Sequence, residues 1–142
     1  MTDKSQALWT FISKYPGIPG ALKFNSITEF VNDTGLIPVS SESVIESYTD
    51  GSSKREYIFA IAQMRVYDEG TSETNIISLF DMQKFMDWII EQGNAGSFPD
   101  FGSDCFIESI EALQNMPDLS GHNEQMVAKY MFQCRIIYYQ EG

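Results

Sequence analysis

The residues that could carry acid–base or nucleophilic chemistry are few in this chain of 142 residues. His122 is the single histidine, and it lies in a loop of Gly and Asn with no nucleophile pattern beside it. Catalysis by histidine needs partners within hydrogen-bond reach. We therefore interpret His122 as an exposed turn residue and predict no catalytic residue.

Acidic side chains cluster at Asp68, Glu69 and Glu73, where they could attract a cation. Their spacing lacks the alternating oxygen ligands and the turn glycine of a calcium loop, so helix capping and solvation explain them better. Three further aspartates lie in or near predicted loops: Asp100, Asp104 and Asp118. The sequence also has no glycine-rich phosphate loop, serine elbow or dinucleotide fingerprint, and we expect no metal and no cofactor.

Two cysteines, Cys105 and Cys134, make no Cys-x-x-Cys pair, and a zinc site would need more ligands than they supply. If the last two strands form a hairpin with a symmetric turn, these cysteines lie opposite each other. The chain starts without the basic flank and apolar run of a secretory signal, so we expect a cytoplasmic environment. Reduced, buried thiols are the expectation there.

Composition favours a folded domain without nucleic-acid or membrane partners. The chain is 43% hydrophobic and 13% aromatic, which is too apolar for disorder despite a formal net charge of −11. Phosphate backbones and anionic membranes would repel such a chain. No apolar stretch approaches the length that spans a bilayer. We predict one domain, residues 1–142.

The other elements are arranged around one helix, predicted from Thr71 to Gly93. Ser72 or Thr74 would cap its start, and Gly93 would end it in a left-handed conformation. A broad apolar arc is expected to face a sheet, and comprises Ile76, Leu79, Phe80, Met82, Phe85, Met86, Ile89 and Ile90. Trp88 and Ile77 fall outside this arc, and we predict that they contact a neighbouring subunit. The alternative is that the loop 97–102 or the connector described below covers them.

Before this helix, the apolar spacing from Leu8 to Tyr15 predicts a short helix that ends at Pro16-Gly17. Residues 16–41 are expected to form an ordered connector, with a helical turn at 26–32. Strands are predicted over 42–48, 57–67, 105–113 and from 126 to the end of the alternating pattern. An Asp50-Gly51 turn joins the first two strands into a hairpin.

Each helix or tight turn reverses the chain, and this predicts the topology α-β-β-α-β-β. The second and fourth strands are antiparallel and the most apolar, so we place them side by side at the centre. The expected fold is α+β, a four-stranded antiparallel sheet in the order 1-2-4-3 with both helices on one face.

Four features between Glu42 and Tyr139 carry a family resemblance: the strand at Arg55–Phe59, the helix with Asp87-Trp88-Ile89, the Phe98-Pro99 loop and the aromatic final strand. In these features the chain resembles the minor capsid and tail terminator proteins of the tailed-phage neck. The resemblance implies a virion protein, assembled in the host cytoplasm. Copies of it, six by family expectation, would form a ring that ends tail growth and docks the head.

The partners implied are further copies of the chain, the tail tube protein and head-connector proteins, and DNA would pass through the lumen without specific binding. One alternative is an acidic inhibitor or immunity protein that blocks a basic partner. It would need clustered carboxylates, yet these run from Asp3 to Glu141. Another alternative, a small enzyme, would need a convergent pocket.

Overall fold

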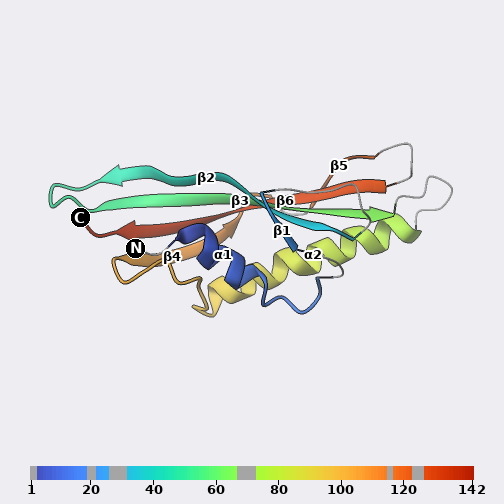
Figure 1. Ribbon diagram of the computed structural model, residues 1–142, viewed down its shortest axis with the longest axis horizontal. Helices are drawn as coiled ribbons and strands as arrows, with labels where there is room; N and C mark the ends of the chain where they lie inside the picture. Colours follow the sequence, from blue (N-terminus) through green and yellow to red (C-terminus); the bar gives the residue numbers. More distant parts are fainter. Residues whose placement is uncertain (1–2, 19–21, 26–31, 67–72, 115–116, 123–126) are drawn as a thin grey trace.

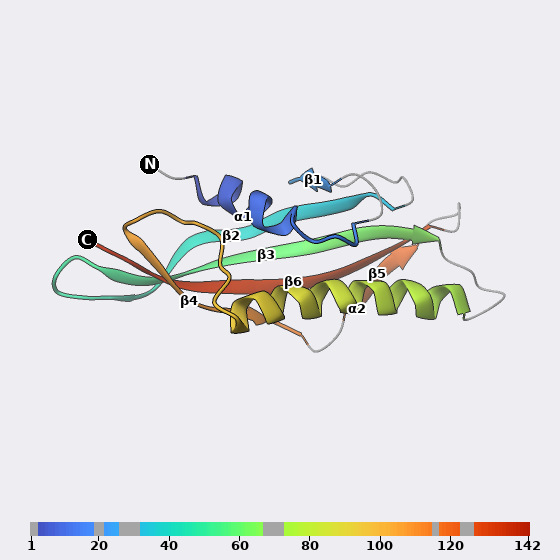
Figure 2. The ribbon, with the colours of Figure 1, turned by 90° about the horizontal axis from the view of Figure 1, so that it is seen from below.

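The computed structural model describes residues 3–18, 22–25, 32–66, 73–114, 117–122 and 127–142. Within these residues the chain is mixed α+β, with two helices on one face of a six-stranded sheet (Figures 1 and 2). The elements are α1 (Lys4–Ile12), β1 (Leu22–Phe24), β2 (Thr34–Ser47), β3 (Ser53–Val66), α2 (Glu73–Asn94), β4 (Cys105–Ala112), β5 (Asp118–His122) and β6 (Val127–Gln140). Neither described helix has the length and apolarity to cross a bilayer.

The sheet is larger than the sequence predicts. Its order is β1-β2-β3-β6-β4, and β5 pairs with β6 beyond β4. The four predicted strands are therefore neighbours in the expected order, but β1 and β5 are additional, and β1 is parallel to β2. The prediction of four strands in a wholly antiparallel sheet differs from the structure in this detail.

Weak local signals explain both missed strands. β1 has three residues, too few to show an alternating pattern, and it lies in the segment 16–41 that was predicted to be a connector. That segment also contains the start of β2, at Thr34. β5 includes Ser, Gly and His in a predicted loop, and only pairing with β6 makes it a strand. The predicted turn at 26–32 falls almost wholly outside the described residues.

The centre of the sheet is the antiparallel pair β3 and β6, whose register is continuous from Ser53↔Gln140 to Val66↔Val127. Side chains alternate between two faces along each strand. Tyr57, Phe59 and Ile61 of β3 point toward the helices and are fully buried. Neither described helix lies on the other face, which we call the open face (Figure 2).

Helix α1 begins at an aspartate cap and lies beside α2. The side chain of Asp3 accepts a hydrogen bond of 2.9 Å from the backbone amide of Ser5. Leu8, Phe11 and Ile12 are buried, as the predicted apolar spacing requires. The helix ends at Ile12, before the predicted stop at Pro16-Gly17.

Helix α2 continues past the predicted stop at Gly93. It ends at Asn94, and the left-handed residue is Gly96, with φ of 76°. The amide of Ser97 donates to the carbonyl of Gln92 at 2.8 Å, and the amide of Gly96 donates to Gly93 at 3.1 Å, the bond pattern of a Schellman cap. At the start of α2, Ser72 and the side chain of Thr74 lie outside the described part of the chain.

Gly93 has a packing role instead. A Cβ atom placed there would lie 3.0 Å from the Cβ of Ile110 on β4. The missing side chain therefore lets α2 approach the sheet closely.

The predicted Asp-Gly hairpin between β2 and β3 is confirmed. Gly51 has φ of 90°, and the amide of Tyr48 donates to the carbonyl of Ser52 at 2.9 Å. The carboxylate of Asp50 accepts hydrogen bonds from the amide and the hydroxyl of Ser52. These bonds lower the pKa of Asp50 from its usual value.

Candidate functional site

One exposed apolar surface lies on the outward side of the first two turns of α2. Ile76 is 64% exposed, Ile77 is 50% exposed and Phe80 is 60% exposed. The ammonium of Lys84 lies 5.4 Å from the centroid of the Phe80 ring, within cation–π range. We call Ile76, Ile77 and Phe80 the helix patch. Grouped apolar side chains on a protein surface mark contact sites.

Helix geometry explains why this patch faces outward. The side of α2 that faces the sheet is buried and comprises Ser78, Met82, Phe85, Met86 and Ile89. At about 100° per residue, Ile76 and Phe80 lie on the opposite side. The prediction that both face the sheet is wrong, because the predicted arc covered more than half of the helix and one sheet face cannot bury that much. The sequence did contain a signal for this exposure, because Ile76 and Phe80 lie far from Phe85 and Ile89 in angle around the helix axis.

The two residues predicted to contact a neighbouring subunit differ in their surroundings. Trp88 is partly buried beneath α1, with its ring centroid 5.6 Å from that of Phe11 and 5.2 Å from that of Tyr15. Thus Phe11 of α1 and Tyr15, which follows α1, pack on Trp88. Ile77 is half exposed and belongs to the helix patch. Their role at an interface stays a prediction.

A second exposed apolar surface lies at the other end of the molecule, beside the β2–β3 turn. Tyr139 is flanked by Tyr48, at 6.2 Å between ring centroids, and by Phe106, at 6.3 Å. Phe106 is 55% exposed and Tyr48 is 39% exposed. We call these three aromatic residues the tip patch. Phe106 and Tyr139 are directly paired across β4 and β6, in alternation with the buried Tyr138, so they lie on the open face.

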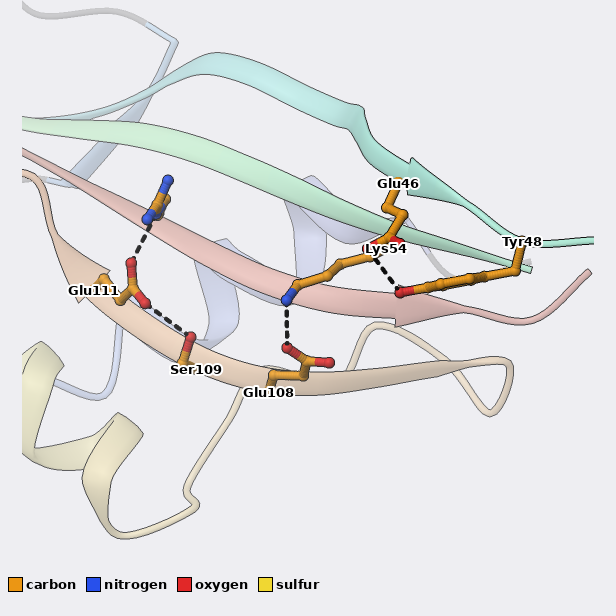
Figure 3. A network of polar contacts seen from close by, with 7 residues as sticks. Glu46, Tyr48, Lys54, Glu108, Ser109 and Glu111 are labelled. Carbon is orange, nitrogen blue, oxygen red and sulfur yellow. Dashed lines mark hydrogen bonds and ion pairs between the residues drawn. The ribbon is translucent and has the colours of Figure 1, made fainter.

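Ion pairs join the strands next to the tip patch (Figure 3). Lys54 on β3 lies 3.3 Å from Glu108 on β4. On β6, Arg135 bonds Glu111 at 2.8 Å and Glu56 at 3.5 Å. The hydrogen bond with Glu111 is the main cause that raises the pKa of Arg135. These side chains are partly exposed, so the pairs chiefly fix strand positions and add little stability.

Negative charge exceeds positive charge around the tip patch. Besides Glu108, the carboxylate of Glu46 lies there and accepts a hydrogen bond of 3.3 Å from the hydroxyl of Tyr48 (Figure 3). The paired ends of β4 and β6 add Asp104 and Glu141. The amide of Gln140 donates to Asp104 at 2.7 Å and lowers its pKa. The tip of the molecule is therefore an aromatic surface with an acidic border.

Shallow grooves flank α1. One has a volume of about 290 Å³ and is lined by Asp3, Ser5, Gln6, Trp9 and Phe24. Another, of about 300 Å³, lies between α1 and residues 98–100. In the first groove, the hydroxyl of Ser5 lies 2.9 Å from that of Tyr57. Burial raises the pKa of Tyr57 from its usual value.

Only part of the predicted chemical residues falls in the described part of the chain. Among the described residues, no group of three or more His, Cys, Asp or Glu side chains could hold a metal ion. Asp68 and Glu69 lie outside the described residues, as do the side chains of Glu73 and His122. The backbone of His122 closes β5.

The two cysteines form no disulfide with each other, and they do not lie on paired positions. Cys105 pairs with Gln140, and Cys134 pairs with Ala112. The symmetric-turn expectation fails because β5 occupies the first half of β6 and leaves its second half to β4. Cys134 is fully buried, which raises its pKa to about 12.

Comparison of the sequence with models of protein families finds no match, and neither does comparison with curated proteins.

Proposed function

We propose that this chain is a structural subunit that assembles with copies of itself. The observation that carries the proposal is the helix patch, in which three large apolar side chains are each at least half exposed. A net charge of −11 favours a dispersed chain in solution. An exposed apolar group on such a chain is therefore best explained as a surface that another protein subunit buries.

The assembly we propose is the ring at the neck or tube end of a tailed phage, where it stops tail growth and docks the head. The support is the order of elements, a helix, a β-hairpin, a long helix and the final strands, which resembles that of the tailed-phage neck proteins. Two separate exposed apolar surfaces, the helix patch and the tip patch, suit a subunit that meets its neighbours in one repeated way. Six copies per ring is the expectation that the resemblance supplies.

A second candidate, an acidic inhibitor of a basic partner, is favoured by one observation. Carboxylates of Glu46, Asp104 and Glu108 lie around the tip, and the backbone of Glu141 bonds that of Asp104 there. An inhibitor of this kind would use the tip alone and would stay monomeric, which leaves the helix patch without a role. We therefore place assembly first.

Light scattering behind a sizing column, over a wide concentration range, tests the proposal, and electron microscopy of the large species shows their shape. We expect a closed ring with a central opening. A monomer at every concentration, including millimolar protein, would contradict self-assembly. A one-to-one complex with a basic partner and no self-association would establish the inhibitor.

A further inference from the structure

We infer that the helix patch of one copy packs on the tip patch of the next copy, with Lys84 facing the acidic border of the tip. This inference rests on the proposed self-assembly and names its surfaces. The contact joins two different surfaces, and each copy has one helix patch and one tip patch.

The start of α2, which carries the helix patch, and the β2–β3 turn, which lies beside the tip patch, are at opposite ends of the molecule (Figure 1). Strand β3 has 14 residues, which span roughly 45 Å at about 3.3 Å per residue. The tip patch lies where β3 begins, and α2 follows the end of β3. One copy cannot bring its own patches together across this distance. A contact between unlike surfaces repeats from copy to copy, and it closes into a ring when the rotation per copy allows.

Charge and chemistry match between the two surfaces. Lys84 lies over the ring of Phe80, and its ammonium marks the border of the helix patch. The tip presents aromatic faces bordered by Glu46 and by Glu108, which already pairs with Lys54. An ammonium is attracted both to carboxylates and to aromatic faces. Two tip patches would instead repel each other through their carboxylates, which disfavours a contact between like tips.

The edges of the sheet are poorly suited to the alternative of strand addition between copies. β1 pairs only with residues 34–36 of β2, and the rest of that edge contains Pro38 and three irregularities of register. At the other edge, β4 has an irregularity between Ile107 and Ser109. Bulges and proline are the features with which edge strands avoid pairing. These features of the edge strands favour a contact through the helix patch and the tip patch instead.

The test uses Phe80→Asp in the helix patch and Phe106→Glu in the tip patch, with Val39→Asp as the matched control. Val39 is an exposed apolar residue of β2 that belongs to neither patch. Circular dichroism and thermal unfolding establish that each variant is folded. We expect both patch variants to lose the assembly seen for the unaltered chain at the same concentration, and the control to keep it.

Mixing the two folded patch variants gives the sharper result. Phe80→Asp keeps an intact tip patch, and Phe106→Glu keeps an intact helix patch. These two intact patches can form one contact between the variants, and the two altered patches cannot form a second. Sedimentation velocity should show a one-to-one dimer that grows no further, and native mass spectrometry should show one copy of each variant. No dimer in the mixture, or normal assembly of either patch variant alone, would overturn the inference.

The unaltered chain keeps the two proposals distinguishable. If the unaltered chain assembles and both patch variants assemble equally well, the proposed function stands and only the named surfaces are wrong. If the unaltered chain never assembles, the proposed function itself fails.

Discussion

At the scale of single residues, the two cysteines should differ sharply in reactivity. Cys134 is fully buried and its pKa is raised to about 12, so almost none of it is thiolate near neutral pH. Cys105 is only partly buried. We expect a maleimide to modify Cys105 alone in the native protein, and both cysteines after unfolding in guanidinium, as measured by mass spectrometry. Rapid modification of native Cys105→Ser protein would contradict this.

Trp88 tests how strongly α1 is held on α2. Its ring contacts Phe11 and Tyr15, so Trp88→Ala should remove apolar contacts and lower the free energy of unfolding by about 2 kcal/mol, less than for a fully buried tryptophan. Denaturant unfolding measures the change. The control is Ile77→Ala, at a half-exposed position where we expect a loss below about 1 kcal/mol. Equal losses would show that Trp88 does not hold α1.

Asp104 should contribute to the acid sensitivity of the tip. The hydrogen bond from Gln140 is the main cause that holds the pKa of Asp104 below its usual value. A lowered pKa in the folded state means that the stabilisation is present above the ordinary carboxyl pKa of about 4 and is lost as the pH falls through the folded value.

Asp104→Asn removes this titrating group while keeping the size of the side chain. The variant should therefore have a lower Tm than the unaltered chain at neutral pH, and the difference should shrink as the pH falls below about 4. Thermal unfolding across this pH range measures it. A difference in Tm that does not change with pH would exclude the titration of Asp104 as its cause.

At the scale of elements, the end of α2 depends on a conformation that favours glycine. Gly96 has φ of 76°, and a Cβ atom there would meet nothing within 4 Å. Gly96→Ala should therefore cost about 1 kcal/mol in free energy of unfolding through backbone strain alone. Gly96→Asn should cost less, because asparagine tolerates the left-handed region. Denaturant unfolding that ranks alanine above asparagine in stability would contradict this account.

The sheet shows how far pattern alone predicts an element. Fourteen-residue strands β3 and β6 carry long alternating runs, and their antiparallel pairing at the centre follows from those runs. β5 has no such run, because Asp118–His122 acquires its strand conformation from hydrogen bonds to β6. Short strands at the periphery are decided by the neighbour they pair with, and their own residues carry little signal.

At the scale of the whole molecule, the net charge of −11 should make stability depend on salt. Self-repulsion destabilises a compact state, and about 1 M salt shortens the Debye length to about 3 Å. We expect Tm to rise by a few degrees between low salt and 1 M NaCl, measured by calorimetry at neutral pH. KCl at the same ionic strength is the control and should give the same rise. A falling Tm would show that the ion pairs of Lys54 and Arg135 outweigh the repulsion.

The amino-acid sequence by itself determined the α+β class, the central pair of strands, the Asp50-Gly51 turn and the long helix. These features depend on local periodicity and turn chemistry, which neighbouring residues carry. It also predicted that Ile77 would be exposed.

Only the tertiary structure decided which apolar residues remain at the surface. Trp88 is covered because α1 lies on it, and Ile76 and Phe80 are exposed because one sheet face buries only part of the circumference of α2. Tyr48, Phe106 and Tyr139 come from three separate segments, and they meet only when β2, β4 and β6 end at the same tip. Burial and proximity depend on segments distant in the chain, so a local pattern cannot determine them.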